Sequence, residues 1–175
     1  MKYFKPALLE RCRSLDDAAT EAASDEWERA VVSYNAELAV IRPQFPAAVR
    51  VVLDRFTLHD AKVLTYFLTK RKLSLLVRLE SASTRPGKML ELKYTIVKNG
   101  LRIVKHGKGK EWPKDRGRIQ YDEFGKAADA PEAIFSHSLL LAGGYELRIR
   151  FTDLHLRRLK KVMFPSVEQA GLGAP

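Results

Sequence analysis

The stretch that decides the fold is residues 46–68, PAAVRVVLDRFTLHDAKVLTYFL, where the spacing of the apolar side chains changes. Its first half carries Val49, Val52 and Phe56 three to four residues apart, which is the spacing of the buried side of a helix. In its second half, residues 63–68 alternate as in a strand, and both faces are expected to be buried as in a central strand. The chain is therefore expected to begin as helix and to continue as sheet.

Helices are predicted from residue 6 to residue 56. A short amphipathic piece covers about 6–14, and residues 24–26 (Ser-Asp-Glu) provide a helix cap followed by acids in the first turn. The main helix ends before Pro43, and Pro46 stands in the first turn of a third helix. The apolar stripe of the main helix consists of Trp27, Ala30, Val31, Tyr34, Leu38 and Ile41.

About seven strands are predicted after the helices. Lys98-Asn99-Gly100 is a turn signal, so the apolar runs on either side of it are expected to form a hairpin. Short connections between strands are typical of an antiparallel meander, and the helices are expected to pack on one face of it. The fold class is thus α+β. The expected strands cover residues 63–68, 73–79, 90–96, 101–104, 119–124, 135–141 and 145–151.

Length and composition favour one domain. The chain has 175 residues, of which 46% are hydrophobic and 30% charged, as in ordinary globular proteins. The predicted domain spans 1–164, with a helical layer over 6–56, a sheet over 61–161 and a flexible tail over 165–175. Cys12 is the one cysteine, which favours a reducing, cytoplasmic location. No secretion signal and no apolar run long enough for a membrane span is apparent.

Positive charge is concentrated in the sheet region. The net charge is +10, but residues 1–60 carry 8 basic and 10 acidic side chains, and residues 61–175 carry 23 basic and 11 acidic ones. The second part therefore has a net charge of +12 (23 − 11) against −2 (8 − 10) for the first. Such a field attracts anionic partners.

A basic segment, residues 98–118, is the main functional clue. It carries a net charge of +6 and a large aromatic residue, Trp112. We expect a binding role rather than catalysis, with an acidic protein partner favoured and nucleic acid bound by the same surface as the alternative. The competing structural interpretation is that these charges only solvate a loop and keep an edge strand from aggregating. The candidate binding residues are Lys105, Lys108, Lys110, Trp112, Arg116, Arg118, Arg148 and Arg150.

Four short pieces of the sequence resemble a family of uncharacterised bacterial proteins. They are Met-Lys-Tyr-Phe at 1–4, a helix carrying Trp27 and Tyr34, Leu-His-Asp-Ala at 58–61, and the hairpin within 135–151. The resemblance implies a small cytosolic α+β protein of unknown function, of the kind found near toxin–immunity loci. It implies an interaction role, such as that of an immunity protein, and no catalytic residue.

A third function, an enzyme that uses His59, Asp60 or His137, is the least favoured interpretation. His59 and Asp60 are adjacent, and in extended backbone they would point to opposite sides and would not bond each other. His137 alternates with serines and shares the apolar side of its strand with Phe135, as a core histidine does. The four histidines of the chain are not at metal-ligand spacing, so neither a metal nor another cofactor is expected.

Acidic residues in the predicted strands are expected to have structural roles. Asp122 and Glu123 should point to opposite faces of their strand. Together with Glu146, they are expected to balance the charges of Arg148 and Arg150.

Overall fold

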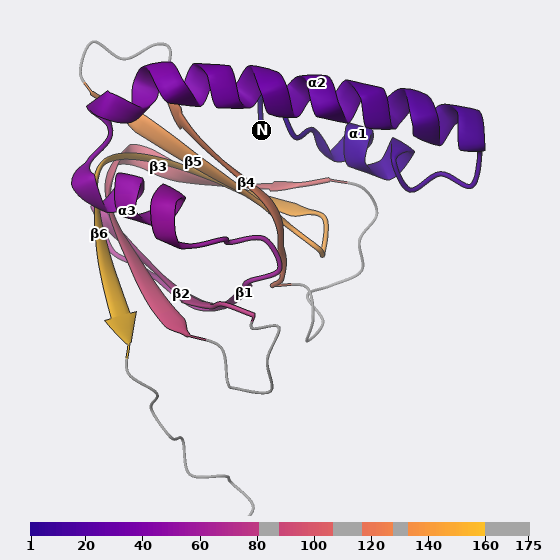
Figure 1. Ribbon diagram of the computed structural model, residues 1–175. Coiled ribbons are helices and arrows are strands. Elements are labelled where there is room, and N and C mark those ends of the chain that lie inside the picture. Colours follow the sequence, from indigo (N-terminus) through magenta and orange to yellow (C-terminus); the bar gives the residue numbers. More distant parts are fainter. Residues whose placement is uncertain (81–87, 107–116, 128–132, 160–175) are drawn as a thin grey trace, which may run out of the picture.

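The computed structural model describes residues 1–80, 88–106, 117–127 and 133–159 (Figure 1). In these residues, three α-helices and a short 3₁₀ helix precede a six-stranded antiparallel sheet, which confirms the α+β class. None of the helices described is long and apolar enough to cross a membrane. The elements are α1 (Pro6–Arg11), α2 (Asp17–Ile41), η1 (Arg42–Gln44), α3 (Ala47–Arg55), β1 (Lys62–Leu68), β2 (Lys72–Arg78), β3 (Met89–Lys105), β4 (Ile119–Lys126), β5 (Phe135–Leu141) and β6 (Tyr145–Leu159).

Helix α2 starts earlier than its apolar stripe indicated. Asp16 is the N-cap, and its carboxylate accepts hydrogen bonds from the N–H groups of Ala18 and Ala19 at 3.1 and 3.3 Å. The predicted cap at Ser24 is wrong, because Ser24 lies inside the helix. The predicted end before Pro43 is confirmed, and the residues of the apolar stripe are all partly buried.

The strand order is β1-β2-β3-β6-β5-β4. Two runs of three consecutive strands are therefore joined through the central pair β3 and β6, which is not the order of a simple meander. The part of the chain that the structure describes has six strands instead of the expected seven. The difference arises because the predicted hairpin at 90–104 is one continuous strand, β3.

A bulge in β3 explains the turn signal at residues 98–100. Between the ladder pairs Ile96–Phe151 and Leu101–Ile149, β3 advances five residues (96 to 101) while β6 advances two (151 to 149). The extra residues turn the backbone locally without ending the pairing of β3 with β6.

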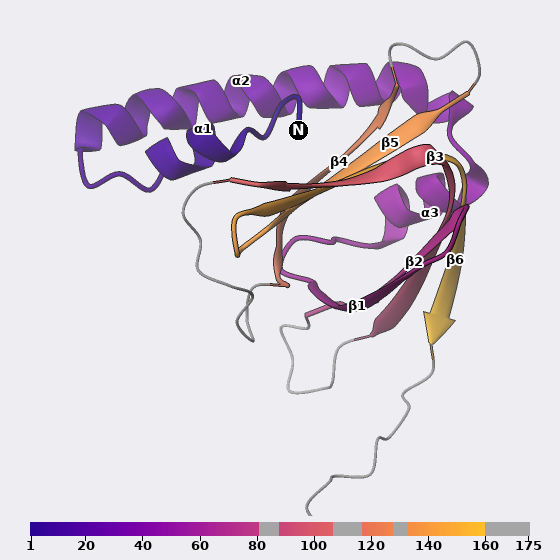
Figure 2. The same cartoon turned by 180° about the vertical axis from the view of Figure 1, so that it is seen from behind.

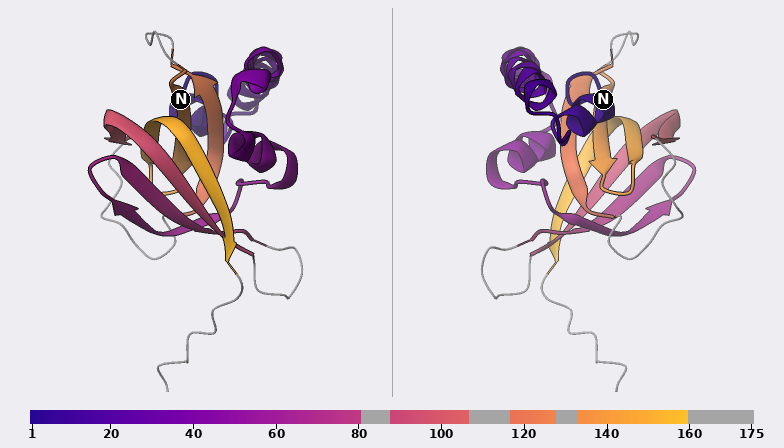
Figure 3. Two further views of the ribbon diagram at one scale, coloured as in Figure 1. Left: turned by 90° about the vertical axis from the view of Figure 1, so that its left-hand side faces the viewer. Right: turned by 90° about the vertical axis from the view of Figure 1, so that its right-hand side faces the viewer.

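The sheet is curved, and helical segments contact both of its faces (Figures 1 and 3). Glu123 and Phe124 are neighbours on β4 and point to opposite faces. On the concave face, the ring of Phe124 lies 6.2 Å from that of Phe45, just before α3. On the convex face, Glu123 binds the backbone of the first residues of the chain. The expectation that the helices cover a single face is therefore not confirmed.

Buried apolar side chains lie on both faces of the sheet. The main core lies on the concave face, where Val49 and Val52 of α3 are buried together with inward side chains of all six strands. Outside this core, the side chains of Phe4, Leu8 and Leu140 are also buried. Figure 2 shows α1 and the N-terminal end beside α2, near β4 and β5.

Backbone hydrogen bonds join the two outer strands of the sheet at one end. The N–H of Asp60 donates to the carbonyl of Ile119 at 2.8 Å, and the N–H of Ile119 donates to Ala61 at 2.7 Å. Next to them, Val63 donates to Gly117 at 2.8 Å. This seam connects the start of β1 to the start of β4, so the sheet closes like a barrel at that end.

Strand β1 is an edge strand over the rest of its length, so its expected central position is wrong. Four of its apolar side chains are between 40% and 70% exposed. Both faces looked buried from the sequence because the strand is apolar throughout, but the strand order places it at the edge. The exposed residues are Leu64, Tyr66, Phe67 and Leu68.

Candidate binding site on the convex face of the sheet

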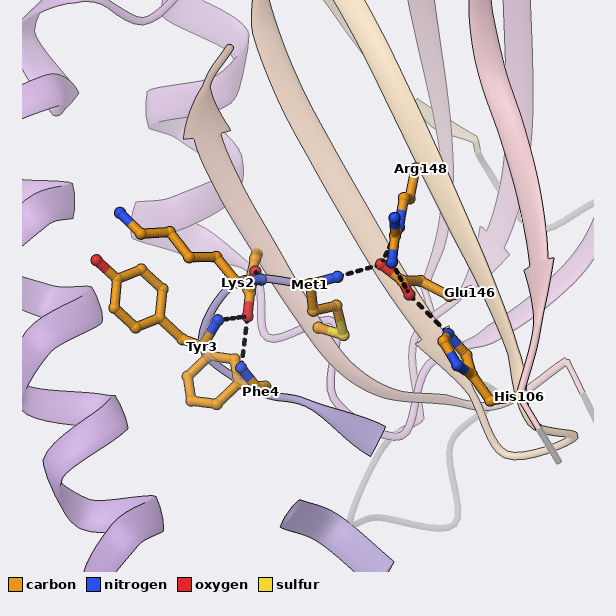
Figure 4. Close-up of polar contacts among 8 residues, drawn as sticks. Met1, Lys2, Tyr3, Phe4, His106, Glu146 and Arg148 are labelled. Atoms are coloured by element: carbon orange, nitrogen blue, oxygen red, sulfur yellow. Dashed lines mark hydrogen bonds and ion pairs between the residues drawn. The ribbon is translucent and has the colours of Figure 1, made fainter. Parts of the chain in front are cut away.

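A buried carboxylate, that of Glu146, holds the first residue of the chain against β6 (Figure 4). Its side chain is fully buried and forms an ion pair with the α-amino group of Met1. Arg148 lies two residues further along the strand, on the same face, and donates from Nε and Nη2 at 2.7 and 2.9 Å. His106 Nε2 lies 2.7 Å from Oε2, the oxygen that also accepts from Nη2 of Arg148. One carboxylate thus contacts four nitrogen atoms from three residues.

These partners determine the ionisation of Glu146. Burial alone would raise the pKa of its carboxyl group, because a charge is costly away from water. The hydrogen bonds from Arg148, the α-amino group of Met1 and His106 outweigh burial and lower the pKa from 4.5 to about 2. The ion pairs therefore persist over the whole neutral and mildly acidic range.

Stability is expected to depend on this carboxyl group in acid. A group whose pKa is lowered in the fold stabilises it above its ordinary pKa, and this contribution is lost as the pH falls through the lowered value. With 4.5 as the ordinary pKa and about 2 in the fold, urea denaturation should show a loss of roughly 3 kcal/mol between about pH 5 and pH 2. A wild-type curve parallel to that of Glu146→Gln over this range would contradict the assignment.

A second buried carboxylate, that of Glu123, fixes the backbone of residues 1–4, here called the N-terminal arm. It accepts hydrogen bonds from three successive N–H groups, those of Lys2, Tyr3 and Phe4, at 2.7, 2.8 and 2.6 Å. Only 7% of Glu123 is exposed. Since these N–H groups have a charged acceptor, the arm can lie on the sheet without joining its ladder.

Aromatic rings hold the end of the arm. The ring of Phe4 lies 4.9 Å from Trp27, 5.3 Å from Tyr34 and 5.7 Å from Tyr121, at distances typical of favourable aromatic pairs. The hydroxyl of Tyr34 accepts a hydrogen bond from the N–H of Phe124 at 2.9 Å, so α2 covers the edge of β4. Burial raises the pKa of Tyr34, which keeps its hydroxyl neutral.

A cavity of about 290 Å³ lies beside the arm. Its lining comes from the arm, from α2 and from the convex face of β4, β5 and β6. The floor includes Gly125, Ser136 and Ser138, and Lys126 and Arg148 also line the cavity. The cavity adjoins the Glu146 ion pairs through Met1 and Arg148, which also line it.

Four of the predicted binding residues lie in the part of the chain that the structure describes, and their surroundings differ. The guanidinium group of Arg148 is bound by Glu146, and Arg118 lies 3.7 Å from the carboxylate of Asp60. Lys105 is exposed, with its Nζ 6.0 Å from the ring centre of Tyr145, and Arg150 is exposed on the convex face. The predicted residues that lie outside the described part of the chain are Lys108, Lys110, Trp112 and Arg116.

His59 and Asp60 do bond each other, which the alternation argument excluded. His59 Nδ1 lies 3.0 Å from the carboxylate of Asp60. The backbone of Asp60 has a φ of +64°, a left-handed turn that brings the two side chains to the same side. Both are about half exposed, and the ring of His59 packs edge-on against Tyr121 at 5.3 Å. The pair closes the junction between α3 and β1.

His137 is a core residue, as its position among apolar residues indicated. It is fully buried and stacks on Phe124 at 3.7 Å. Its Nδ1 lies 2.7 Å from the hydroxyl of Tyr94, and its Nε2 lies 3.3 Å from the carboxylate of Asp122. A ring that accepts from Tyr94 at Nδ1 and donates to Asp122 from Nε2 satisfies both contacts. Because His137 is enclosed, it does not reach a substrate.

The acidic residues of the strands have partners that differ in part from those expected. Asp122 and Glu123 do point to opposite faces, as predicted, but they bind His137 and the N-terminal arm rather than arginine. Glu146 does balance Arg148. Among the described residues, no group of three or more His, Cys, Asp or Glu side chains is arranged to hold a metal ion.

Sequence reasoning missed the N-terminal arm, His106 and the two serines of the cavity floor. A signal existed for some of them. Glu123 and Glu146 both lie in predicted strands, and an acid that a strand buries requires a partner. Ser136 and Ser138 alternate with buried residues, which assigns them to the opposite face. Nothing in the sequence indicated that the partner would be the chain's first residues.

No protein-family model matches the chain, and no curated protein or solved structure matches it either. The resemblance based on residues 1–4 and 58–61 therefore stays a prediction. What the structure adds is that the Met-Lys-Tyr-Phe piece and the Trp27/Tyr34 helix are in contact with each other.

Proposed function

We propose that this protein is a non-catalytic binding protein that pairs with an extended, acidic segment of a partner protein along the outer edge of β1. The observation that carries the proposal is the exposed apolar surface of β1. Of its side chains, Phe67 is 70% exposed and Tyr66 is 48% exposed. Exposed edge strands of this kind are templates for strand addition, in which a partner segment extends the sheet. An immunity-type interaction role, implied by the family resemblance, belongs to the same proposal.

The backbone of β1 offers hydrogen bonds on its outer side. The N–H of Thr69 donates to the carbonyl of Lys72 on β2 at 2.8 Å. Alternate residues of a strand send their N–H groups to the same side, so those of Tyr66 and Leu68 point away from β2. Among the described strands, none pairs with this side of Tyr66–Leu68. An added strand would find unpaired donors and acceptors there.

The charge around β1 favours an acidic partner. Lys70 and Arg71 lie in the turn after β1, Lys72 is the first residue of β2, and all three are exposed. No partner of their side chains lies in the described part of the chain. Carboxylates flanking the apolar residues of an added segment would meet these charges and would speed association, since the whole chain carries a net charge of +10.

A titration of the isotope-labelled full-length protein with a capped peptide of alternating valine and aspartate tests the proposal. The largest NMR shifts are expected at the amides of residues 64–72. Phe67→Ser should weaken binding about tenfold, because aromatic anchors dominate such interfaces. Leu68→Pro should also weaken it, because proline removes an outward N–H without touching the ladder to β2.

Val32→Ser is the matched control, because Val32 is 68% exposed on α2, away from β1. It should leave the affinity unchanged, and a peptide with lysine in place of aspartate should not bind. Equal effects of Phe67→Ser and Val32→Ser would contradict the proposal. Nucleic acid would be the better partner if duplex DNA bound instead, with log affinity falling by about 0.9 per neutralised phosphate as log salt rises.

A further inference from the structure

The floor of the cavity beside the N-terminal arm is open because its residues are small. Gly125 stands opposite Ser136 in the ladder of β4 and β5, and Glu123 stands opposite Ser138. A Cβ atom at position 125 would lie 3.1 Å from the hydroxyl oxygen of Ser136. The glycine therefore leaves space directly beside a serine hydroxyl, on the face that also carries Arg148.

Hydrogen-bond donors around this floor are left unused. Neither serine hydroxyl has a hydrogen-bond partner among the described residues. Arg148 donates to Glu146 from Nε and from one proton of Nη2, so Nη1 and the second Nη2 proton stay available. Its side chain is 43% exposed. Lys126 donates to Gln44 at 2.9 Å and keeps two further donors.

Acceptors around the cavity are engaged, in contrast to the donors. Glu123 already accepts three N–H groups, and Glu37 is bound by the ammonium group of Lys2 and the hydroxyl of Tyr3. Including Glu146, three carboxylates face four cationic groups, an excess of one positive charge (4 − 3). The cationic groups are the α-amine of Met1 and the side chains of Lys2, Lys126 and Arg148.

We infer that this cavity binds an oxyanion, a phosphate or carboxylate group of a small ligand, between the hydroxyls of Ser136 and Ser138 and the side chains of Arg148 and Lys126. The anion would accept the unused donors and offset the excess positive charge. A volume of about 290 Å³ corresponds to about ten water molecules at roughly 30 Å³ each. The ligand is therefore small, with space for the oxyanion and a short organic group. This site is separate from β1 and does not depend on the proposed function.

Titration of the isotope-labelled full-length protein with inorganic phosphate and with acetate tests the inference, with sodium chloride at equal ionic strength as the reference. Saturable shifts at the amides of Gly125, Ser136 and Ser138 are expected for phosphate, acetate or both. A response to phosphate alone identifies a phosphorylated ligand, and a response to acetate alone a carboxylate. The double variant Ser136→Ala with Ser138→Ala should bind at least about tenfold more weakly, since it loses two hydrogen bonds to a charge.

The control is Ser74→Ala, a serine of β2 outside the cavity. If the double variant does not fold, Lys126→Gln provides the test, because Lys126 is exposed. It should weaken binding about threefold through the lost charge, whereas Lys88→Gln, also exposed, should not. Two results would overturn the inference. One is the absence of saturable binding of either anion at tens of millimolar, and the other is binding with shifts elsewhere that these variants leave unchanged.

Discussion

Replacing Glu146 by glutamine is expected to lower the free energy of unfolding by about 3–5 kcal/mol, the usual effect of removing one partner from a buried ion pair. The carboxylate is fully buried, as is the α-amino group of Met1 that it binds. Glutamine has nearly the same size but carries no charge, and its amide group would place donors against the donors of Arg148. The substitution therefore leaves two positive groups close together without their counter-charge.

Urea denaturation at pH 7 measures this loss of unfolding free energy directly. In thermal unfolding, the same loss should appear as a fall of roughly 10 °C in Tm. Glu80→Gln is the matched control. Glu80 also pairs with an arginine, Arg78 at 3.3 Å, but its side chain is 51% exposed. Such surface pairs contribute at most about 1 kcal/mol. If both variants lost the same small amount, the Glu146 ion pairs would not be stabilising the fold.

Replacing Gly100 by alanine is expected to destabilise the protein by about 3 kcal/mol through overpacking. A Cβ atom there would lie 2.5 Å from the carbonyl oxygen of Arg150 and 2.7 Å from that of Val97. Both are backbone atoms, so the clash cannot be relieved by turning a side chain. The preceding residue, Asn99, has a φ of +56°, which leaves the bulge little freedom to adjust.

Gly125→Ala is the control for this prediction. Its Cβ would meet the hydroxyl of Ser136 at 3.1 Å, and that side chain can rotate away. Its stability should therefore change by less than about 1 kcal/mol. Thermal or urea unfolding of the two variants gives the comparison, and a mild effect at Gly100 would mean that the β3–β6 pairing tolerates a shift at the bulge.

Local structure in this protein could be predicted from its sequence. The stripe from Trp27 to Ile41 marked the buried side of α2, and period-two alternation located the strands, because both patterns follow from the geometry of a single segment. The same alternation assigned His137 to the core. Even the failed hairpin at residues 98–100 reflected a real feature, the bulge in β3.

Contacts between distant segments could not be predicted in this way. The position of β1 at the edge follows from the pairing of β3 with β6 as well as with β2. That pairing joins distant segments, so no single segment of the sequence indicates it. The same holds for the site. Met1 and Glu146 are 145 residues apart, and an acid in a strand does not reveal which cation will reach it. The prediction that His59 and Asp60 would not bond each other was wrong for a local reason, because the left-handed backbone at Asp60 was not recognised from the sequence.

The seam between β1 and β4 makes the sheet a ring that is fastened at one end only. Opening it requires breaking the few backbone hydrogen bonds around Ala61 and Ile119, whereas separating β3 from β6 breaks the longest ladder of the described sheet. The contact between β1 and β4 is therefore expected to be the least stable strand contact of the described sheet. Small excursions from the native state should begin there, so deuterium should replace the amide protons of Asp60 and Ile119 well before those at the centre of β3.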